Sequence, residues 1–162
     1  MTLPRWVAGA DPRRTAIRVA VLVVAAYLTF SYVLLPVRGD SISMTPTIES
    51  GDLIFINRLT YRFREPRRGE VVAIRMAGRS VVYVKRLLGL PGDRVKIDNG
   101  NVSINDEWIK EPYAHRRDDW SLDEVTLNRD EYFVVGDNRT MAMALHDMGT
   151  VPRARLIGAQ IF

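Results

Sequence analysis

The stretch that decides the fold is RVKIDNGNVSIN, residues 94–105. Two runs rich in β-branched residues flank Asn99-Gly100, a dipeptide typical of the two-residue type I′ turn of a β-hairpin. Runs of similar composition occur elsewhere in the chain, at 53–57, 70–76, 80–90, 131–135 and 155–162. No long amphipathic helix separates them, so the sequence predicts a mainly β domain with an antiparallel sheet. Residues 111–130 are polar, and we expect them to form a surface loop.

A long apolar segment precedes the predicted β domain. Residues 19–37, VAVLVVAAYLTFSYVLLPV, carry no charge, and a helix of this length would extend about 30 Å, the thickness of the hydrocarbon core. A buried core helix would show a polar face, and a cleaved signal peptide would end in an A-x-A-like site. The segment has neither feature. The sequence therefore predicts one N-terminal transmembrane helix between an N-terminal segment, 1–18, and a C-terminal domain, 38–162.

The charges flanking this segment differ between its two ends. Four arginines lie within residues 1–18, whereas Arg38 alone directly follows the segment and is close to Asp40. Cytoplasmic flanks of membrane helices carry the excess of positive charge. We therefore expect residues 1–18 to be cytoplasmic and residues 38–162 to be extracytoplasmic.

Composition narrows the possible chemistry. The 162 residues include no cysteine, which excludes thiol catalysis and disulfides, and two histidines that lack a metal-ligand spacing. No metal site is expected. The net charge of +4 could suggest nucleic acid, but basic residues are scattered beside acidic ones, so nucleic acid is not an expected partner.

A hydrolase without cysteine requires a serine, a threonine or an activated water. His146 is one candidate base for a serine, although the adjacent Asp147 is poorly placed to orient it. Lys85 is the other candidate. Alternate residues of a strand share a face, so one of Lys85 and Arg86 must point into the interior or a cleft. A buried lysine tends to lose its proton and can then act as a general base, whereas an exposed lysine on an edge strand remains the alternative.

Five motifs follow the apolar segment in a set order. They are SMTPT (43–47), GDLIFINR (51–58), RRGEVVAI (67–74), YVKRLLGLPGDRV (83–95) and GDNR (136–139). This set resembles the type I signal peptidases, membrane-anchored serine proteases that remove signal peptides from exported proteins. The resemblance runs from about Asp40 to the C-terminus and includes the preceding anchor. It implies a single-pass protein of the bacterial plasma membrane that acts on signal-peptide-bearing preproteins at the lipid bilayer, without a cofactor, and we expect a monomer.

The resemblance also assigns roles to individual residues. It implies that Ser43 is the nucleophile and Lys85 its general base, a known variant of serine catalysis. The Ser41 hydroxyl and the Ser43 backbone N–H would form the oxyanion hole, each donor contributing about 3–4 kcal/mol. The family's groove binds an extended chain as an added strand. Its apolar lining is matched by Met44, Ile48, Tyr83 and Val84.

The region after GDNR departs from the family pattern. Ala142 and Ala144 stand where the family usually has a serine and an aspartate, and His146 replaces an arginine. The family serine bonds the catalytic lysine, so its absence would remove one orienting partner. The loss of the aspartate would remove a salt-bridge acceptor, for which Asp147, three residues further on, is a candidate replacement. Within GDNR itself, a solvated loop is the default expectation, and an internal ion pair between Asp137 and Arg139 is the alternative.

Three alternatives remain open. A dedicated processing peptidase of the same family, such as one that matures conjugative pilin subunits, would carry the same motifs. The self-cleaving repressors also use serine and lysine on a related β-fold, but they require a scissile bond upstream of the serine in a soluble chain. A catalytically impaired, membrane-anchored peptide-binding relative would account for Ala142 and Ala144.

Overall fold

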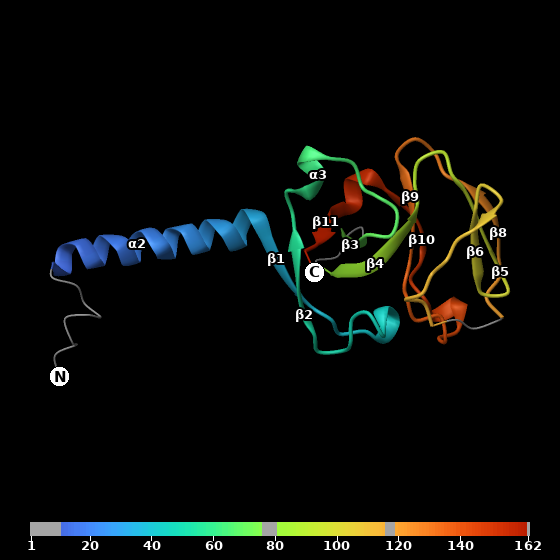
Figure 1. Cartoon of the computed structure of the whole chain (residues 1–162), viewed down its shortest axis with the longest axis horizontal. Helices are drawn as coiled ribbons and strands as arrows, with labels where there is room; N and C mark the ends of the chain where they lie inside the picture. The colour runs from blue at the N-terminus through green and yellow to red at the C-terminus, as the bar shows by residue number, and fades with distance from the viewer. Residues whose placement is uncertain (1–10, 76–80, 116–118, 162) are drawn as a thin grey trace.

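The computed structural model describes residues 11–75, 81–115 and 119–161. Within these residues the chain forms one apolar helix followed by a mainly β domain (Figure 1). The predicted fold class is therefore confirmed. Parts of the predicted N-terminal segment and of the runs 70–76, 80–90 and 155–162 lie outside the described residues.

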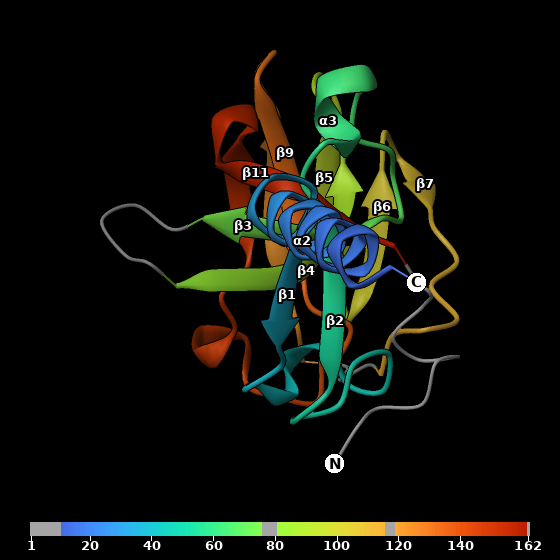
Figure 2. The ribbon, with the colours of Figure 1, turned by 90° about the vertical axis from the view of Figure 1, so that its left-hand side faces the viewer.

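The apolar helix is α2, Pro12–Leu28, continued by the π-helical turn η1, Thr29–Val33. Its first turn is capped by Asp11, whose carboxylate accepts the backbone N–H groups of Arg13 and Arg14. Proline occupies the first helical position, where its missing N–H costs nothing. The stretch Pro12–Val33 has a mean hydropathy of 1.9 and is not buried against the domain. Figure 2 shows α2 nearly end-on.

The helix ends earlier than the predicted span of residues 19–37. Leu34–Arg38 form strand β1, which pairs with β2 across the full length of both strands. Pro36 cannot donate to a helical hydrogen bond, and it is tolerated here because β1 lies at the edge of its sheet. An apolar strand and an apolar membrane helix have the same composition, which is why the boundary was misplaced.

Two antiparallel sheets make up the β domain. The larger has the order β1-β2-β11-β3-β4-β9-β10 and the smaller has the order β7-β6-β5-β8. Beyond β1, the strands of the larger sheet are β2 Leu53–Asn57, β3 Val71–Arg75, β4 Val82–Gly89, β9 Glu131–Val135, β10 Gly149–Pro152 and β11 Leu156–Gln160. Those of the smaller sheet are β5 Arg94–Asp98, β6 Asn101–Ile104, β7 Glu107–Trp108 and β8 Leu122–Thr126. Short helical turns complete the domain: η2 Ile42–Met44, α3 Thr60–Phe63, η3 Met143–Leu145 and η4 Arg153–Arg155.

The predicted hairpin at Asn99-Gly100 is present. Both residues have positive φ, 47° and 74°, as a type I′ turn requires, and they connect β5 to β6. The prediction of a surface loop over residues 111–130 is wrong in part. Strand β8 pairs with β5 in this region, and Trp120 before it is fully buried, its indole N–H donating to the Met141 carbonyl at 2.8 Å.

The core consists of three clusters of buried apolar side chains. One of them positions the functional site. It joins Met44 and Ile48 from the segment after β1 to Ile54 and Ile56 of β2 and Ala73 of β3. The loop between β1 and β2 is therefore packed against the sheet instead of being free in solvent.

Candidate active site

Ser43 lies in the short turn η2, directly after β1. The turn begins at Ser41, whose Oγ accepts the Ser43 backbone N–H at 3.2 Å. The GDNR motif holds it from the other side. The Asn138 backbone N–H donates to the Ser43 carbonyl and its side-chain amide donates to the Ile42 carbonyl, both at 3.0 Å. These bonds fix a serine that is only 7% exposed.

Lys85 reaches this serine from the middle of β4. Its Nζ lies 2.8 Å from Ser43 Oγ, within hydrogen-bonding distance, and the residue is 3% exposed. Burial lowers the pKa of Lys85 from 10.5 to about 8, and the nearby Asp147 carboxylate partly opposes this shift. A substantial fraction of the amine is therefore neutral near pH 8, and a neutral amine at this distance can accept the Ser43 proton.

The two oxyanion-hole donors implied by the resemblance are neighbours. Without substrate, the Ser43 N–H is bonded to Ser41 Oγ. Because Ser41 Oγ is the acceptor in this bond, the Ser41 hydroxyl can still donate its own proton to another acceptor. A substrate oxyanion would have to replace Ser41 Oγ as the acceptor of the Ser43 N–H.

A cavity of about 200 Å³ adjoins Ser43. All four residues that match the family's groove, Met44, Ile48, Tyr83 and Val84, line it together with Ser41 and Ser43. Residues 37–39 and 81–84 also line it. The structure therefore brings every residue with a predicted site role to one place.

The alternative of an ion pair between Asp137 and Arg139 is absent from the part of the chain that the structure describes. Asp137 instead accepts two hydrogen bonds from Arg86, at 2.8 and 2.5 Å, and a third from the Thr47 hydroxyl. Arg139 forms a fully buried bidentate pair with Glu111. The reason is register, because Arg86 lies opposite Val135, two residues before Asp137.

The burial of β4 goes further than the expectation that one of its two cations would point into the interior or a cleft. Lys85 and Arg86 point to opposite faces, yet both are buried, at 3% and 8% exposure. Arg86 is buried by contacts with Asp137, Thr47 and the Gly69 carbonyl. Arg86 links this motif to SMTPT through Asp137 and Thr47, and Tyr113 stacks on its guanidinium with 3.8 Å between the carbon and the ring centre.

His146 does not contact Ser43 through a hydrogen bond among the described residues. Its Nε2 accepts the Gly136 N–H at 2.8 Å, and its ring packs edge-to-face on Trp120. Burial, reinforced by the positive charges of Lys85 and Arg139, lowers the pKa of His146 to about 4. The imidazole is therefore neutral, with its acceptor nitrogen occupied, and the geometry favours Lys85 as the base.

Gly136 is a site residue that the sequence did not single out. A Cβ built at this position would lie 2.2 Å from the Ser43 carbonyl oxygen and 2.5 Å from His146 Nε2. Only a hydrogen side chain lets the GDNR loop approach Ser43 this closely. Ala142 and Ala144 are exposed, whereas Asp147 lines a second cavity, of about 120 Å³, together with Lys85.

Comparison with known proteins identifies relatives of this chain. The model of the family described as signal peptidase, peptidase S26, matches residues 13–162. A probable signal peptidase I-2 of Synechocystis is 36% identical over 73% of this chain and 57% of the relative. Signal peptidase I of Bacillus licheniformis is 32% identical over 89% of this chain and 83% of the relative. A crystal structure of a signal peptidase I from Enterococcus faecalis superimposes with a TM-score of 0.46 and 24% identity, over 59% of this chain and 97% of that one.

Coverage of the relatives is uneven. The chain spans 57% of the Synechocystis relative and 63% of a signal peptidase I of Leptolyngbya laminosa, but 83% of the Bacillus licheniformis protein. The family model, in contrast, matches nearly the entire chain, from the first turn of α2 to the C-terminus. This chain belongs to the signal peptidase, peptidase S26, family.

Proposed function

We propose that the protein is a serine endopeptidase that removes N-terminal signal peptides from exported preproteins by means of a Ser43–Lys85 dyad. The observation that carries this proposal is the 2.8 Å approach of a buried lysine amine to a buried serine hydroxyl. A charged lysine in such a place is costly unless it is paired with an acid, and here its hydrogen-bond partner is a neutral hydroxyl. Family membership supports the same activity.

In the proposed mechanism, neutral Lys85 takes the proton of Ser43 as Oγ attacks the scissile carbonyl. The Ser43 N–H and the Ser41 hydroxyl stabilise the oxyanion. Lys85 then gives its proton to the leaving amine, the peptide bond breaks, and the signal peptide remains as an ester on Ser43. A water molecule, deprotonated by Lys85, hydrolyses the ester and regenerates Ser43.

The groove beside Ser43 supports binding of an extended peptide. Two backbone segments, 37–39 and 81–84, border it, and Met44 and Ile48 form a buried apolar floor. An extended chain lying between such segments can bond to their backbones while its alternate side chains enter the cavity. Met44, Ile48, Tyr83 and Val84 are therefore proposed as substrate-binding residues.

Helix α2 with η1 supports a membrane anchor. Pro12–Val33 is long and apolar enough to cross a bilayer, and no residue of its apolar window is buried. We propose a single-pass topology with the N-terminus in the cytoplasm and the β domain outside the plasma membrane. Ser43 would then lie a short distance along the chain from the membrane surface, where exported chains emerge.

Incubation of the full-length protein in detergent with a signal-peptide-bearing preprotein, followed by N-terminal sequencing of the product, tests the activity. Ser43→Ala and Lys85→Ala should each abolish cleavage, because one removes the nucleophile and the other its base. Lys96→Ala is the matched control, since the Lys96 side chain is 48% exposed. Ala142→Ser should leave cleavage intact or improve it.

Two results would contradict the proposal. Full cleavage by Lys85→Ala would exclude the dyad. Binding of the preprotein without any new N-terminus would favour the peptide-binding alternative instead. The position of the new N-terminus also reports which side chains the groove accepts.

A further inference from the structure

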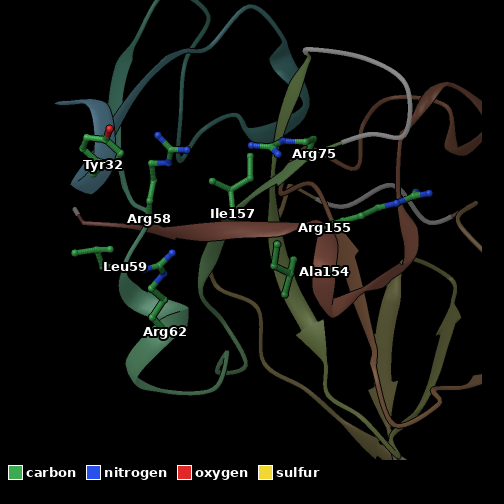
Figure 3. Close-up of a pocket in the computed structure, with 9 residues that line it drawn as sticks. Tyr32, Arg58, Leu59, Arg62, Arg75, Ala154, Arg155 and Ile157 are labelled. Atoms are coloured by element: carbon green, nitrogen blue, oxygen red, sulfur yellow. The ribbon is translucent and has the colours of Figure 1, made fainter. Parts of the chain in front are cut away.

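A separate cavity, of about 290 Å³, lies beside the end of the apolar helix, and neither Ser43 nor Lys85 lines it. Figure 3 shows its main polar side chains, contributed by distant parts of the chain. Arg58 follows β2, Arg62 lies in α3, Arg75 ends β3 and Arg155 precedes β11. No acidic residue is among the described residues that line it.

The charge of this cavity is not neutralised. Among the described residues, none of its four arginines forms an ion pair with an aspartate or a glutamate. Arginines elsewhere in the domain do have such partners, as in Arg68–Asp93, Arg86–Asp137 and Arg139–Glu111. Arginine remains charged at every usable pH. Figure 3 shows the Arg155 side chain extending away from those of Arg58 and Arg62, so the unpaired positive charge at the cavity comes mainly from Arg58, Arg62 and Arg75. Such a concentration of like charge attracts an anion.

The cavity is attached to the last turn of the apolar helix. Arg58 donates from Nη1 to the Ser31 carbonyl at 2.6 Å and from its backbone N–H to the Val33 carbonyl at 2.8 Å. Tyr32, in the same turn, lines the cavity and is 65% exposed, and Phe63 beside Arg62 is 82% exposed. Exposed aromatic side chains at the end of an apolar helix are typical of the boundary between lipid and water.

We propose that this cavity binds the phosphate group of an anionic phospholipid. Guanidinium groups can bond phosphate oxygens in pairs, and Tyr32, which lines the cavity, would contact the start of the acyl chains. The position beside an exposed apolar helix favours a lipid over free phosphate, which has no need of an apolar neighbour. The inference rests on the proposed membrane anchor and not on proteolysis.

Arg62 and Arg75 are the residues to change. Both side chains are exposed and form no hydrogen bond or ion pair among the described residues, whereas Arg58 anchors the helix end. The test variant is Arg62→Ala/Arg75→Ala. Its control is Arg67→Ala/Arg129→Ala, which removes two equally exposed arginines outside the cavity and changes the net charge by the same amount.

Native mass spectrometry of the full-length protein in detergent would measure retention of added phosphatidylglycerol, phosphatidylcholine or inorganic phosphate. We expect phosphatidylglycerol to bind more tightly than phosphatidylcholine by about tenfold or more, and the test variant to lose that preference. The control variant should keep it within about twofold. Melting temperatures, recorded in parallel, should match between the two variants.

Three outcomes would overturn the proposal. These are equal retention of both lipids, equal loss in both double variants, and binding of inorganic phosphate as tight as that of phosphatidylglycerol. Cleavage of the preprotein, measured on the same samples, separates this result from the proposed activity. Intact cleavage with no lipid preference would overturn the lipid site alone.

Discussion

Replacing Lys85 by methionine should abolish cleavage and at the same time stabilise the protein at neutral pH. Methionine has nearly the length and volume of lysine and no charge, so it can fill the same buried position. The wild-type lysine carries a free-energy cost in the folded state, because burial lowers its pKa from 10.5 to about 8. Removal of the amine removes this cost.

The size of the effect follows from the pKa. Keeping the Lys85 amine charged in the folded protein below pH 8 costs about 3 kcal/mol. Methionine would leave Ser43 Oγ without its partner, a loss of about 1 kcal/mol. The net gain is about 2 kcal/mol, which corresponds to a rise of about 4–8 °C in the melting temperature of a chain of this size.

The gain should depend on pH in a defined direction. Between pH 8 and 10.5 the unfolded wild-type chain binds a proton that the folded chain does not, so wild-type stability rises with pH. The advantage of Lys85→Met is therefore largest below pH 8 and disappears as the pH approaches 10.5. Above that value the variant should be slightly less stable than the wild type.

Thermal unfolding of both proteins in one detergent, measured at several values of pH between 6 and 11, tests this expectation. Lys96→Met is the control and should shift the melting temperature very little, because the Lys96 side chain is 48% exposed. A Lys85→Met protein less stable than the wild type at pH 6 would refute the reasoning. A gain that does not shrink above pH 8 would refute it as well.

Further changes probe the surroundings of the dyad. Gly136→Ala should lower the rate of preprotein cleavage by about 100-fold, because the new methyl group displaces the Ser43 carbonyl; unchanged kinetics would contradict the close approach. Asp137→Ala should destabilise the domain by about 3–5 kcal/mol in denaturant unfolding, because it leaves the Arg86 charge buried and unpaired. As the pH falls from 6.5 to 4, the unfolded chain protonates His146 before the folded one does, so stability should fall. His146→Gln, which retains an acceptor for Gly136, should flatten this acid dependence of the melting temperature.

Strand prediction succeeded where the hydrophobic pattern was strong. The predicted runs 53–57, 94–98 and 131–135 coincide with β2, β5 and β9. Strand β8 was missed because it is polar and lies at an edge, with Leu122 and Val125 only half-buried. A strand that covers little apolar surface leaves little signal in its sequence.

The residues of the candidate site were predictable from the sequence, but the ion pairs around them were not. The motifs led to the residues that surround Ser43, because those motifs are local in sequence. The ion pairs were not predictable, since pairing depends on register between distant strands. Arg86 reaches Asp137 only because β4 and β9 align Arg86 with Val135, and no local pattern specifies that alignment.

The two adjacent cations of β4, Lys85 and Arg86, are both buried, but they differ in whether they can lose their proton. Arg86 cannot lose its proton, so its burial requires the Asp137 carboxylate, and the resulting pair ties the GDNR loop to the nucleophile turn. Lys85 can lose its proton, and its burial beside the Ser43 hydroxyl makes that loss favourable near pH 8. A carboxylate bonded directly to Lys85 would keep the amine charged and unable to act as a base. The more distant Asp147 is compatible with function because its field only moderates the effect of burial. The distribution of acids around β4 therefore determines which of its two cations provides structure and which can provide catalysis.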